Sequence, residues 1–282
     1  MNTSTPLLPL VSVCIPTYQA AKTIVETLQG VLNQTYRNLE IIICDNQSSD
    51  NTVELIRHIQ DPRIQLSVNS ENFGMVGNFN IVLSKARGMY VKLLCADDVI
   101  TNTCIEKEVK VFMQHSDKQI VMVAAEKFVI NEKGKQLFIK HFPGKAGLYQ
   151  GEQALRKSFR HGTNIFGEPG SVLFLNEAVQ KAGKIDLPQS LTYVVDLQLY
   201  TQVLKQGCLF VLKEPLFSFR VSNHSFTATS KWEPAKVFHQ FRKKLTHENS
   251  IKFSFSDKIM AFAMAWMLCL ARNLIFTFTN KK

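Results

Sequence analysis

The chain has 282 residues, of which 45% are hydrophobic and 20% charged, and its formal net charge is +10. This apolar content suffices for one large globular domain or two small ones, and it excludes a disordered chain, a collagen-like repeat and a disulfide-stapled miniprotein. Residues 222–282 hold ten Lys/Arg and three Asp/Glu, so they carry +7 of the total charge. The basic character therefore belongs mainly to the last 61 residues.

The amino terminus lacks the features of a secretory signal. No Lys or Arg precedes the apolar run in MNTSTPLLPL, and Pro6 and Pro9 interrupt it. The six cysteines form no C-x-x-C pair and have no His at metal-ligand spacing. We therefore expect a cytoplasmic protein whose cysteines are buried, reduced thiols.

The first hundred residues alternate between short apolar runs and segments of helical periodicity. The expected strands are 11–15, 39–44, 64–68 and 89–95, and the expected helices are 20–34, 52–59 and 78–86. Strands that alternate with helices of this length indicate right-handed βαβ units and a mainly parallel sheet. In such open sheets ligands bind at the carboxyl ends of the strands.

The pattern is less regular after residue 99. Helices are expected at 106–115, 152–160 and 196–206, strands at 120–125 and 171–175, and a hairpin-like turn at 131–134. No internal repeat or low-complexity linker occurs. This continuity favours one domain with a helical tail over two independent domains.

Polar or conformationally special residues follow three of the early strands. Pro16-Thr17-Tyr18 ends the first, Asp45 ends the second, and Asp97-Asp98 follows LLC. Two adjacent carboxylates can hold a hard divalent cation such as Mg or Mn, although Asp is also common in ordinary loops. A carboxylate at position 45 can bond a nucleobase or ribose, or act as a turn or cap residue.

Several other nucleotide-binding and catalytic motifs are absent. The first strand is not followed by G-x-G-x-x-G, and the sequence contains neither G-x-x-x-x-G-K-[ST] nor G-x-S-x-G. A dinucleotide-binding Rossmann domain, a P-loop protein and a serine hydrolase of the elbow type are therefore not expected.

The first hundred residues resemble family 2 glycosyltransferases of the GT-A fold. The resemblance is carried by the phrases P-T-Y at 16–18, Q-T-Y-R-N-L-E at 34–40, D-N-Q-S-S-D-N-T at 45–52, and the run 71–98 ending in C-A-D-D. These phrases occur in the family's order. The resemblance implies a GT-A domain over 1–225, with a nucleotide-binding half at 1–105 and an acceptor half at 106–225.

The resemblance also implies a reaction and roles for the nucleotide-binding half. The activity would be transfer of a sugar from a nucleotide-diphosphate donor to an acceptor hydroxyl, with inversion and a divalent cation, Mg or Mn. The acceptor would be a saccharide or a lipid-linked saccharide of surface polysaccharide or glycolipid biosynthesis. The residues that would contact the donor are Pro16, Thr17, Tyr18, Asp45, Asn72 and Asp97, and Asp98 would bind the metal. The phrase C-A-D-D lacks a third acidic residue that many relatives carry.

In the second half the match covers shorter phrases. Asp196 matches the aspartate that serves as catalytic base, without the acidic neighbour that relatives carry, and a helix N-cap is its alternative role. Arg220 matches a residue that contacts phosphate in the family, and its alternative role is to pair with a surface carboxylate. His224 matches a residue that contacts the metal or the diphosphate, and the alternative is an ordinary surface or core histidine. The turn 167–171 also resembles a G-E-P-S phrase of the family.

The tail at 226–282 mixes cations with aromatic residues. Its apolar run 259–271 is 13 residues long, shorter than the 20 or so that a bilayer span needs. Such a segment suits the surface of a membrane, for example the inner face of the plasma membrane, or a buried or self-associating helix. Periodicity does not separate these two interpretations.

Other functions remain as alternatives. A non-catalytic sugar-nucleotide-binding protein that retains the fold would explain the incomplete acidic phrases. A nucleotidyltransferase would be expected to carry a Gly-rich loop after the first strand, but this sequence has Pro-Thr-Tyr at 16–18 instead. Nucleic acid is not an expected partner, because no known binding module accompanies the basic charge.

Overall fold

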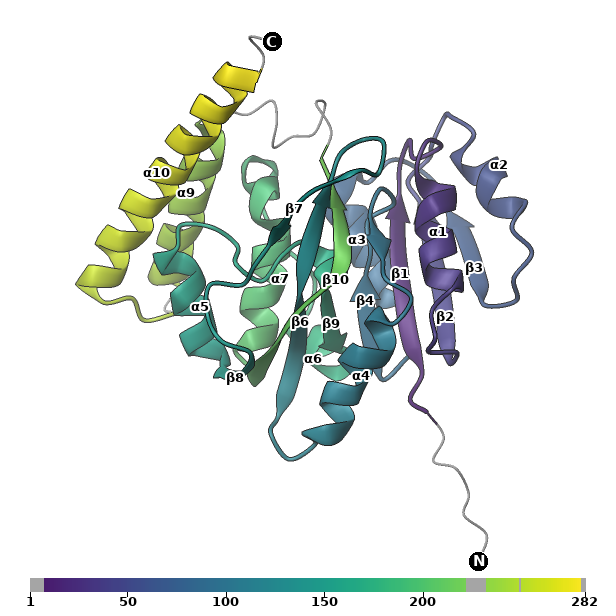
Figure 1. The fold of residues 1–282 in the computed structure, drawn as a ribbon, viewed down its shortest axis with the longest axis horizontal. Helices are drawn as coiled ribbons and strands as arrows, with labels where there is room; N and C mark the ends of the chain where they lie inside the picture. The colour runs from purple at the N-terminus through teal and green to yellow at the C-terminus, as the bar shows by residue number, and fades with distance from the viewer. Residues whose placement is uncertain (1–7, 222–231, 249, 280–282) are drawn as a thin grey trace, which may run out of the picture.

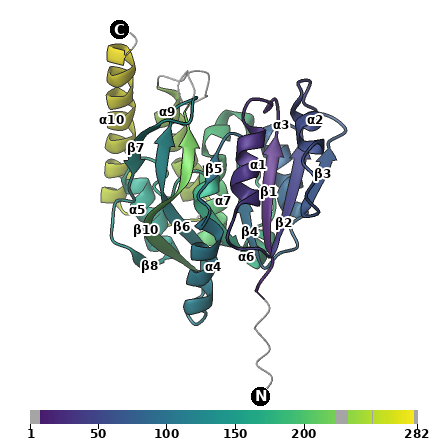
Figure 2. The ribbon, with the colours of Figure 1, turned by 45° about the vertical axis from the view of Figure 1, so that its right-hand side comes forward.

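The computed structural model describes residues 8–221, 232–248 and 250–279, with one sheet through the middle of the protein and helices on both faces (Figure 1 and Figure 2). The strands are β1 (Val11–Thr17), β2 (Leu39–Asp45), β3 (Ile64–Val68), β4 (Tyr90–Leu93), β5 (Val99–Ile100), β6 (Ile120–Ile130), β7 (Gln136–Lys140), β8 (Gly147–Gln150), β9 (Val172–Leu175) and β10 (Cys208–Arg220). The α-helices are α1 (Ile24–Leu32), α2 (Thr52–Arg57), α3 (Gly74–Ser84), α4 (Cys104–Gln114), α5 (Gly151–Arg160), α6 (Asn176–Ala182), α7 (Val195–Leu204), α9 (Glu233–His247) and α10 (Phe255–Thr279). Two 3₁₀ helices, η1 (Pro169–Ser171) and η2 (Gln189–Val194), complete the set.

The sheet has a parallel half and a mixed half. Its order is β3-β2-β1-β4-β9-β6-β10-β5, with β7 beside β6 and β8 beside β10. The first four strands are parallel, which confirms the βαβ prediction for this half. Beyond β4 the sheet is not mainly parallel, because β9 runs antiparallel to both β4 and β6, and β5, β7 and β8 also form antiparallel pairs. A connection as short as 131–135 can join only antiparallel strands.

The parallel strands are buried on both faces. All seven residues of β1 and all seven of β2 are buried. Because successive side chains point to opposite faces, Val13 and Ile15 enter the core beneath α1, α2 and α4, while Cys14 and Ile42 enter the core beneath α3, α5, α6 and α7. A strand covered on both faces is continuously apolar, which is why 39–44 is recognisable from sequence.

A buried ion pair joins the two halves. Lys92 of β4 and Glu108 of α4 have fully buried side chains, and Lys92 Nζ lies 2.9 Å from Glu108 Oε2. The same ammonium donates to the carbonyl oxygens of Gly170 at 2.9 Å and Val172 at 3.2 Å. It therefore fixes the loop before β9 against the strand that leads to Asp97.

The first helix of the tail is part of the core. Val237, Phe238, Phe241 and Leu245 of α9 are buried in the same cluster as α5 and α7. The Phe238 ring lies 5.2 Å from that of Phe159 in α5. For α9 the buried interpretation is confirmed.

The second helix of the tail has two different faces. Asp257 is fully buried and pairs with Arg156 at 2.8 Å and Arg160 at 3.2 Å, which fastens α10 to α5. The other apolar face is exposed, and its large side chains are Phe255, Ile259, Met260, Phe262, Met267, Leu268 and Leu270. Within the described residues, none of the helices has both the length and the apolar character needed to cross a membrane.

The Lys92–Glu108 pair leads to a stability prediction. Glu108→Ala leaves a buried ammonium without its carboxylate, and we expect it to lower the free energy of unfolding by about 3–5 kcal/mol. Lys110→Ala, on the exposed side of α4, should change it by less than about 0.5 kcal/mol. Urea denaturation followed by circular dichroism measures both, and equal effects of the two variants would contradict the prediction.

Candidate active site

Three strand ends come together as the sequence predicts. β2, β1 and β4 are neighbours, and Thr17 pairs with Asp45 in the register of β1 and β2. Thr17 Oγ1 donates to Asp45 Oδ2 at 2.9 Å. The predicted residues Thr17 and Asp45 therefore lie side by side at the carboxyl edge of the sheet.

Asp45 is completely buried and organises the loop that follows it. Its Oδ1 accepts the Ser48 N–H at 2.8 Å, and its Oδ2 accepts the Ser48 hydroxyl at 2.6 Å in addition to Thr17. Pro16 is buried within β1, whereas the Tyr18 side chain is 51% exposed at the start of the next loop. The Tyr18 ring is thus accessible to a ligand at this edge.

An asparagine network supports the predicted residue Asn72. Asn46 Nδ2 donates to Asn72 Oδ1 at 2.6 Å, and Asn46 Oδ1 accepts from Asn69 Nδ2 at 3.0 Å. Asn69 Nδ2 also donates to Asn78, whose own Nδ2 bonds the backbone oxygens of Thr17 and Cys44. Sequence analysis missed Asn46, Asn69 and Asn78. Asn46 and Asn69 directly follow the ends of β2 and β3, which is the signal that could have identified them, whereas Asn78 lies within α3.

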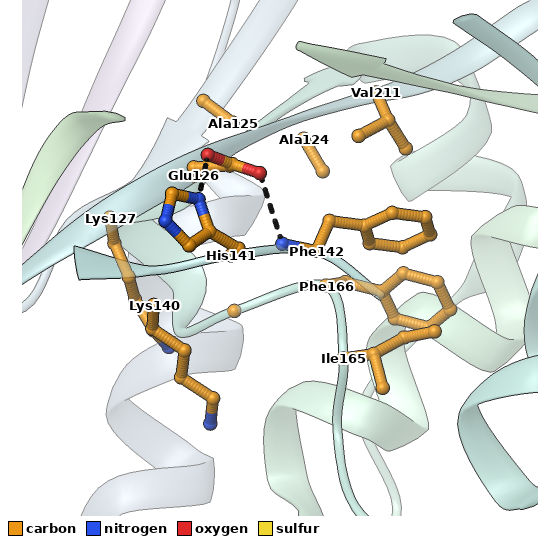
Figure 3. Close-up of a pocket in the computed structure, with 11 residues that line it drawn as sticks. Ala124, Ala125, Glu126, Lys127, Lys140, His141, Phe142, Ile165, Phe166 and Val211 are labelled. Atoms are coloured by element: carbon orange, nitrogen blue, oxygen red, sulfur yellow. Dashed lines mark hydrogen bonds and ion pairs between the residues drawn. The ribbon is translucent and has the colours of Figure 1, made fainter. Parts of the chain in front are cut away.

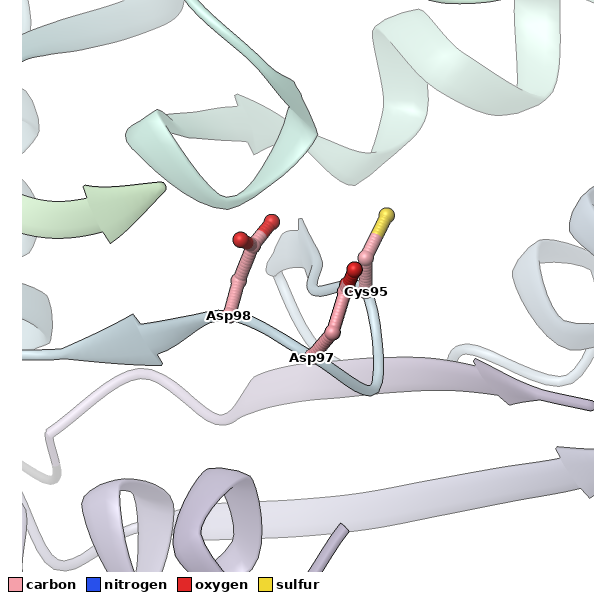
Figure 4. A group of neighbouring side chains, drawn as sticks. All are labelled: Cys95, Asp97 and Asp98. Atoms are coloured by element: carbon pink, nitrogen blue, oxygen red, sulfur yellow. The ribbon is translucent and has the colours of Figure 1, made fainter. Parts of the chain in front are cut away.

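Asp97 and Asp98 follow β4 on a turn that α1 fastens in place. Thr23, just before α1, and Thr27, within it, donate to the carbonyl oxygens of Ala96 and Asp98, each at 2.8 Å. The carboxylates of Asp97 and Asp98 and the thiol of Cys95 lie within 4.8 Å of one another (Figure 4). Asp97 is exposed and Asp98 is buried.

The electrostatics of this cluster favour a cation. Burial raises the pKa of Asp98 well above its ordinary value, and the charge of Asp97 raises it further. Burial, followed by the charges of Asp98 and Asp97, also raises the pKa of the Cys95 thiol. A protonated thiol is a poor ligand for Mg or Mn, but the two carboxylates provide the hard oxygen donors that such cations bind.

Arg220 holds the turn from the far end of β10. Its backbone N–H donates to Asp98 Oδ1 at 3.0 Å, and its Nε donates to the Asp97 carbonyl oxygen at 2.8 Å. Its guanidinium also pairs with Glu26 of α1 at 2.6 Å. A phosphate contact of Arg220, as predicted, would compete with Glu26. The other residue predicted from this phrase, His224, lies outside the described residues.

Asp196 lies in the first turn of α7. Its Oδ2 accepts Asn164 Nδ2 at 2.6 Å, and its Oδ1 accepts the Leu197 N–H at 2.7 Å. Burial raises the pKa of Asp196, while these two hydrogen bonds and the charge of Lys127 oppose the rise. The charge of Asp196 is also the smallest of the causes that raise the pKa of Cys95, the thiol beside Asp97 and Asp98.

The loop before η1 positions Asn164. Asn164 Nδ2 donates to the Gly167 carbonyl oxygen at 2.7 Å, and Tyr200 Oη reaches the same oxygen at 3.1 Å. Gly167 has φ +102°, and a Cβ there would lie 2.1 Å from Ser171 Oγ. Only glycine fits this backbone. Sequence analysis missed Asn164, because nothing near it in the chain connects it with Asp196.

Two lysines border a pocket beside this loop. The pocket is lined by residues of β6, β7 and β10 and of the segments 141–142 and 165–167. Lys127 and Lys140 leave their strands toward the same side, away from Glu126 (Figure 3). Lys127 is buried and pairs with Glu168. Burial lowers the pKa of Lys127 well below its ordinary value, with the charge of Lys140 as the next cause. Sequence analysis missed both lysines.

Comparison with known proteins identifies relatives in bacteria. A model of the family described as Glycosyl transferase family 2 matches residues 12–181. An uncharacterized glycosyltransferase of Haemophilus influenzae is 26% identical over 86% of this chain and 73% of its own length. An Escherichia coli protein, a UDP-Glc:alpha-D-GlcNAc-diphosphoundecaprenol beta-1,3-glucosyltransferase, is 38% identical over 39% of this chain. That match spans 47% of the E. coli protein's length.

Solved structures share the architecture. S. aureus TarS 1-349 in complex with UDP-GlcNAc gives a TM-score of 0.68 at 18% identity, over 96% of this chain and 74% of that one. The mannosyltransferase PcManGT from Pyrobaculum calidifontis, in complex with GDP-Man and Mn2+, gives a TM-score of 0.65 at 19% identity, over 94% of this chain and 72% of that one. The predicted GT-A fold is confirmed.

The hydrogen bond of Asn164 leads to a prediction about Asp196. This bond favours the ionised carboxylate, so Asn164→Ala should raise the pKa of Asp196 further. Asn80→Ala, which removes an amide that also bonds a backbone oxygen, should leave that pKa unchanged. Carboxyl ¹³C NMR titration of both variants measures the effect, and a pKa that stays constant in Asn164→Ala would refute it.

Proposed function

The chain belongs to glycosyl transferase family 2, and from this premise we propose that it transfers a sugar from a nucleotide-diphosphate donor to an acceptor hydroxyl, with inversion at the anomeric carbon. The observation that carries the proposal is the Asp97–Asp98 carboxylate pair on the turn after β4, with the charge of Asp196 acting on Cys95 in the same cluster. Asp97 and Asp98, which follow β4, can act on the leaving diphosphate, and Asp196 of α7 can act on the attacking hydroxyl.

The donor would bind over the ends of β1 and β2. Thr17, Tyr18, Asp45 and Asn72 provide an exposed aromatic ring and a buried carboxylate in a rigid polar frame. These groups suit a base and a ribose. The solved neighbours carry UDP-GlcNAc or GDP-Man, which supports a nucleoside diphosphate as the leaving group here.

Asp98, with Asp97 beside it, would hold a divalent cation, Mg or Mn. The two carboxylates match the oxygen ligands of such ions, and the Mn2+ in the PcManGT structure supports the assignment. When bound, the cation would supply positive charge to the diphosphate as it leaves. Arg220 would keep the Asp98 carboxylate and the Asp97 backbone in place from β10.

Asp196 would act as the general base. Its carboxylate is held by Asn164 and Leu197, so it has a fixed direction. It would take the proton of the acceptor hydroxyl while that oxygen bonds the anomeric carbon and the bond from this carbon to the diphosphate oxygen breaks. Attack opposite to the leaving group inverts the configuration of that carbon.

The acceptor would be a saccharide linked to a lipid, as in surface polysaccharide or glycolipid biosynthesis. The E. coli relative is named for a diphosphoundecaprenol-linked acceptor, which supports this class. The exposed apolar side chains of α10 would lie against a membrane, and lysines such as Lys252 and Lys258 near the start of the helix would meet anionic lipid.

One experiment tests the catalytic proposal. In calorimetric titrations we expect UDP or GDP to bind with Mn present, and Asp98→Asn to abolish the metal-dependent binding. Asp196→Asn should bind the same nucleotide with unchanged affinity, while release of nucleoside diphosphate from the matching nucleotide sugar falls by about 10²–10⁴-fold. The loss is expected because the attacking hydroxyl or water no longer has its base.

Asp186→Asn is the matched control, since Asp186 is an exposed aspartate away from the site, and it should change neither property. Tight nucleotide binding without turnover in the unmodified protein would favour the alternative, a non-catalytic sugar-nucleotide-binding protein. Absence of binding with UDP, GDP, dTDP and CMP would overturn the proposal.

The membrane contact is tested by vesicle sedimentation. The unmodified protein should sediment with vesicles of anionic lipid, and the double variant Ile259→Asp, Phe262→Asp should bind at least about tenfold more weakly, because two exposed apolar side chains that would enter the lipid become charged. Gln153→Asp, which adds charge on the exposed side of α5, is the control. Dimerisation through α10 without vesicle binding, seen by light scattering, would refute the contact.

A further inference from the structure

Two lysines stand directly opposite each other in the mixed half of the sheet. Lys127 of β6 and Lys140 of β7 are partners in an antiparallel pair, so their side chains leave the sheet on the same face. Like charges in this position repel each other. A protein that keeps such a pair needs negative charge close to both ammonium groups.

The described residues give an ion-pair partner to only one of the two, although the charge of Asp196 also acts on Lys140 from beyond ion-pair distance. Lys127 pairs with Glu168, but no carboxylate oxygen in the described part of the chain lies within ion-pair distance of Lys140 Nζ. Glu126, the neighbour on β6, is already paired with Lys213 at 2.7 Å and His141 at 2.6 Å. Lys140 therefore offers an exposed cation beside a buried one.

The pair lies next to the groups that hold Asp196. A Cβ on Gly167 would lie 3.7 Å from Lys127 Nζ, and the Gly167 carbonyl oxygen is the one that Asn164 and Tyr200 bond. Asn164 in turn holds the Asp196 carboxylate. The two ammonium groups thus border the proposed base rather than the ends of β1 and β2.

We propose that Lys140, with Lys127 beside it, binds a phosphate group of the acceptor, so that the acceptor is a phosphate- or diphosphate-linked saccharide. The inference rests on the proposed function and narrows its substrate class. A phosphate at this point would give Lys140 the ion-pair partner that the described residues do not provide, and it would anchor the acceptor while its hydroxyl reaches Asp196. The donor's own diphosphate has its place at Asp97 and Asp98, with a cation there to neutralise it.

The test uses a diphosphate that carries no sugar, in the presence of a filled donor site. Geranyl diphosphate is titrated calorimetrically into the full chain saturated with UDP and Mn, and geraniol serves as the neutral probe. We expect binding of the diphosphate but not of geraniol. Lys140→Ala should weaken it at least tenfold, Lys140→Arg should retain it, and Lys133→Ala, in the exposed turn of the same hairpin, should leave it unchanged.

The outcomes separate this inference from the proposed function. If UDP binds with Mn but geranyl diphosphate does not, the acceptor assignment is wrong while the donor site stands. If Lys140→Ala weakens UDP binding instead, the lysines serve the donor's diphosphate, and the inference is overturned. Because Lys140 is exposed, the variants should fold, and circular dichroism checks this.

Discussion

Arg220 makes the contacts that connect the Asp97–Asp98 turn with the last strand of the sheet. It reaches the Asp97–Asp98 turn from the last strand of the sheet, and it also pairs with Glu26 of α1. The backbone N–H of the same residue bonds the buried Asp98 carboxylate. One residue thus connects the parallel half, the mixed half and the helix that supports the turn. Together with Thr23 and Thr27, it holds the turn on which two carboxylates of like charge lie next to each other.

Buried or closely spaced charges occur at several places around the site, and each is neutralised by a residue that is distant in the sequence. Lys92 neutralises Glu108 and at the same time bonds the loop that carries Glu168. Glu168 neutralises Lys127, which opposes the raised pKa of Asp196. Positive and negative groups therefore alternate from α4 to α7. The position of the proposed base depends on packing deep in the sheet as well as on its own helix.

The parallel half could be predicted because its signals are local. Each strand is an apolar run, each is followed by a helix, and the residues after the strand ends meet because neighbouring parallel strands end at one edge. Thr17 and Asp45 were placed by this rule alone. The asparagines behind Asn72 were missed, since single asparagines in loops resemble ordinary turn residues.

The mixed half could not be predicted in the same way, because its contacts are made between distant segments. Asp196 was found through a resemblance, but its partner Asn164 lies 32 residues earlier in the chain. β10 contains Pro215, which lacks a backbone N–H and is unusual within a strand, so the strand is hard to recognise from sequence. The composition of the tail is visible in the sequence, but the face of α10 that packs against the protein is not. That face is determined by the ion pairs of Asp257 and by the small residues that pack against α5 and α9.

The register of β6 determines which of its charged side chains points toward Asp196. Side chains alternate along a strand, so a slip of one residue would exchange Lys127 for Glu126 on the face toward Asp196. The pairing of β10 with β6 is irregular at this point: the register shifts between Leu212 and Pro215 and again before Phe217, opposite Glu126 and Lys127. Irregular pairing of this kind re-aims side chains beside active sites. The backbone of β10 therefore helps to determine which β6 side chain points toward Asp196, and the Phe219 ring of β10 lies with its centroid 5.5 Å from Lys127 Nζ.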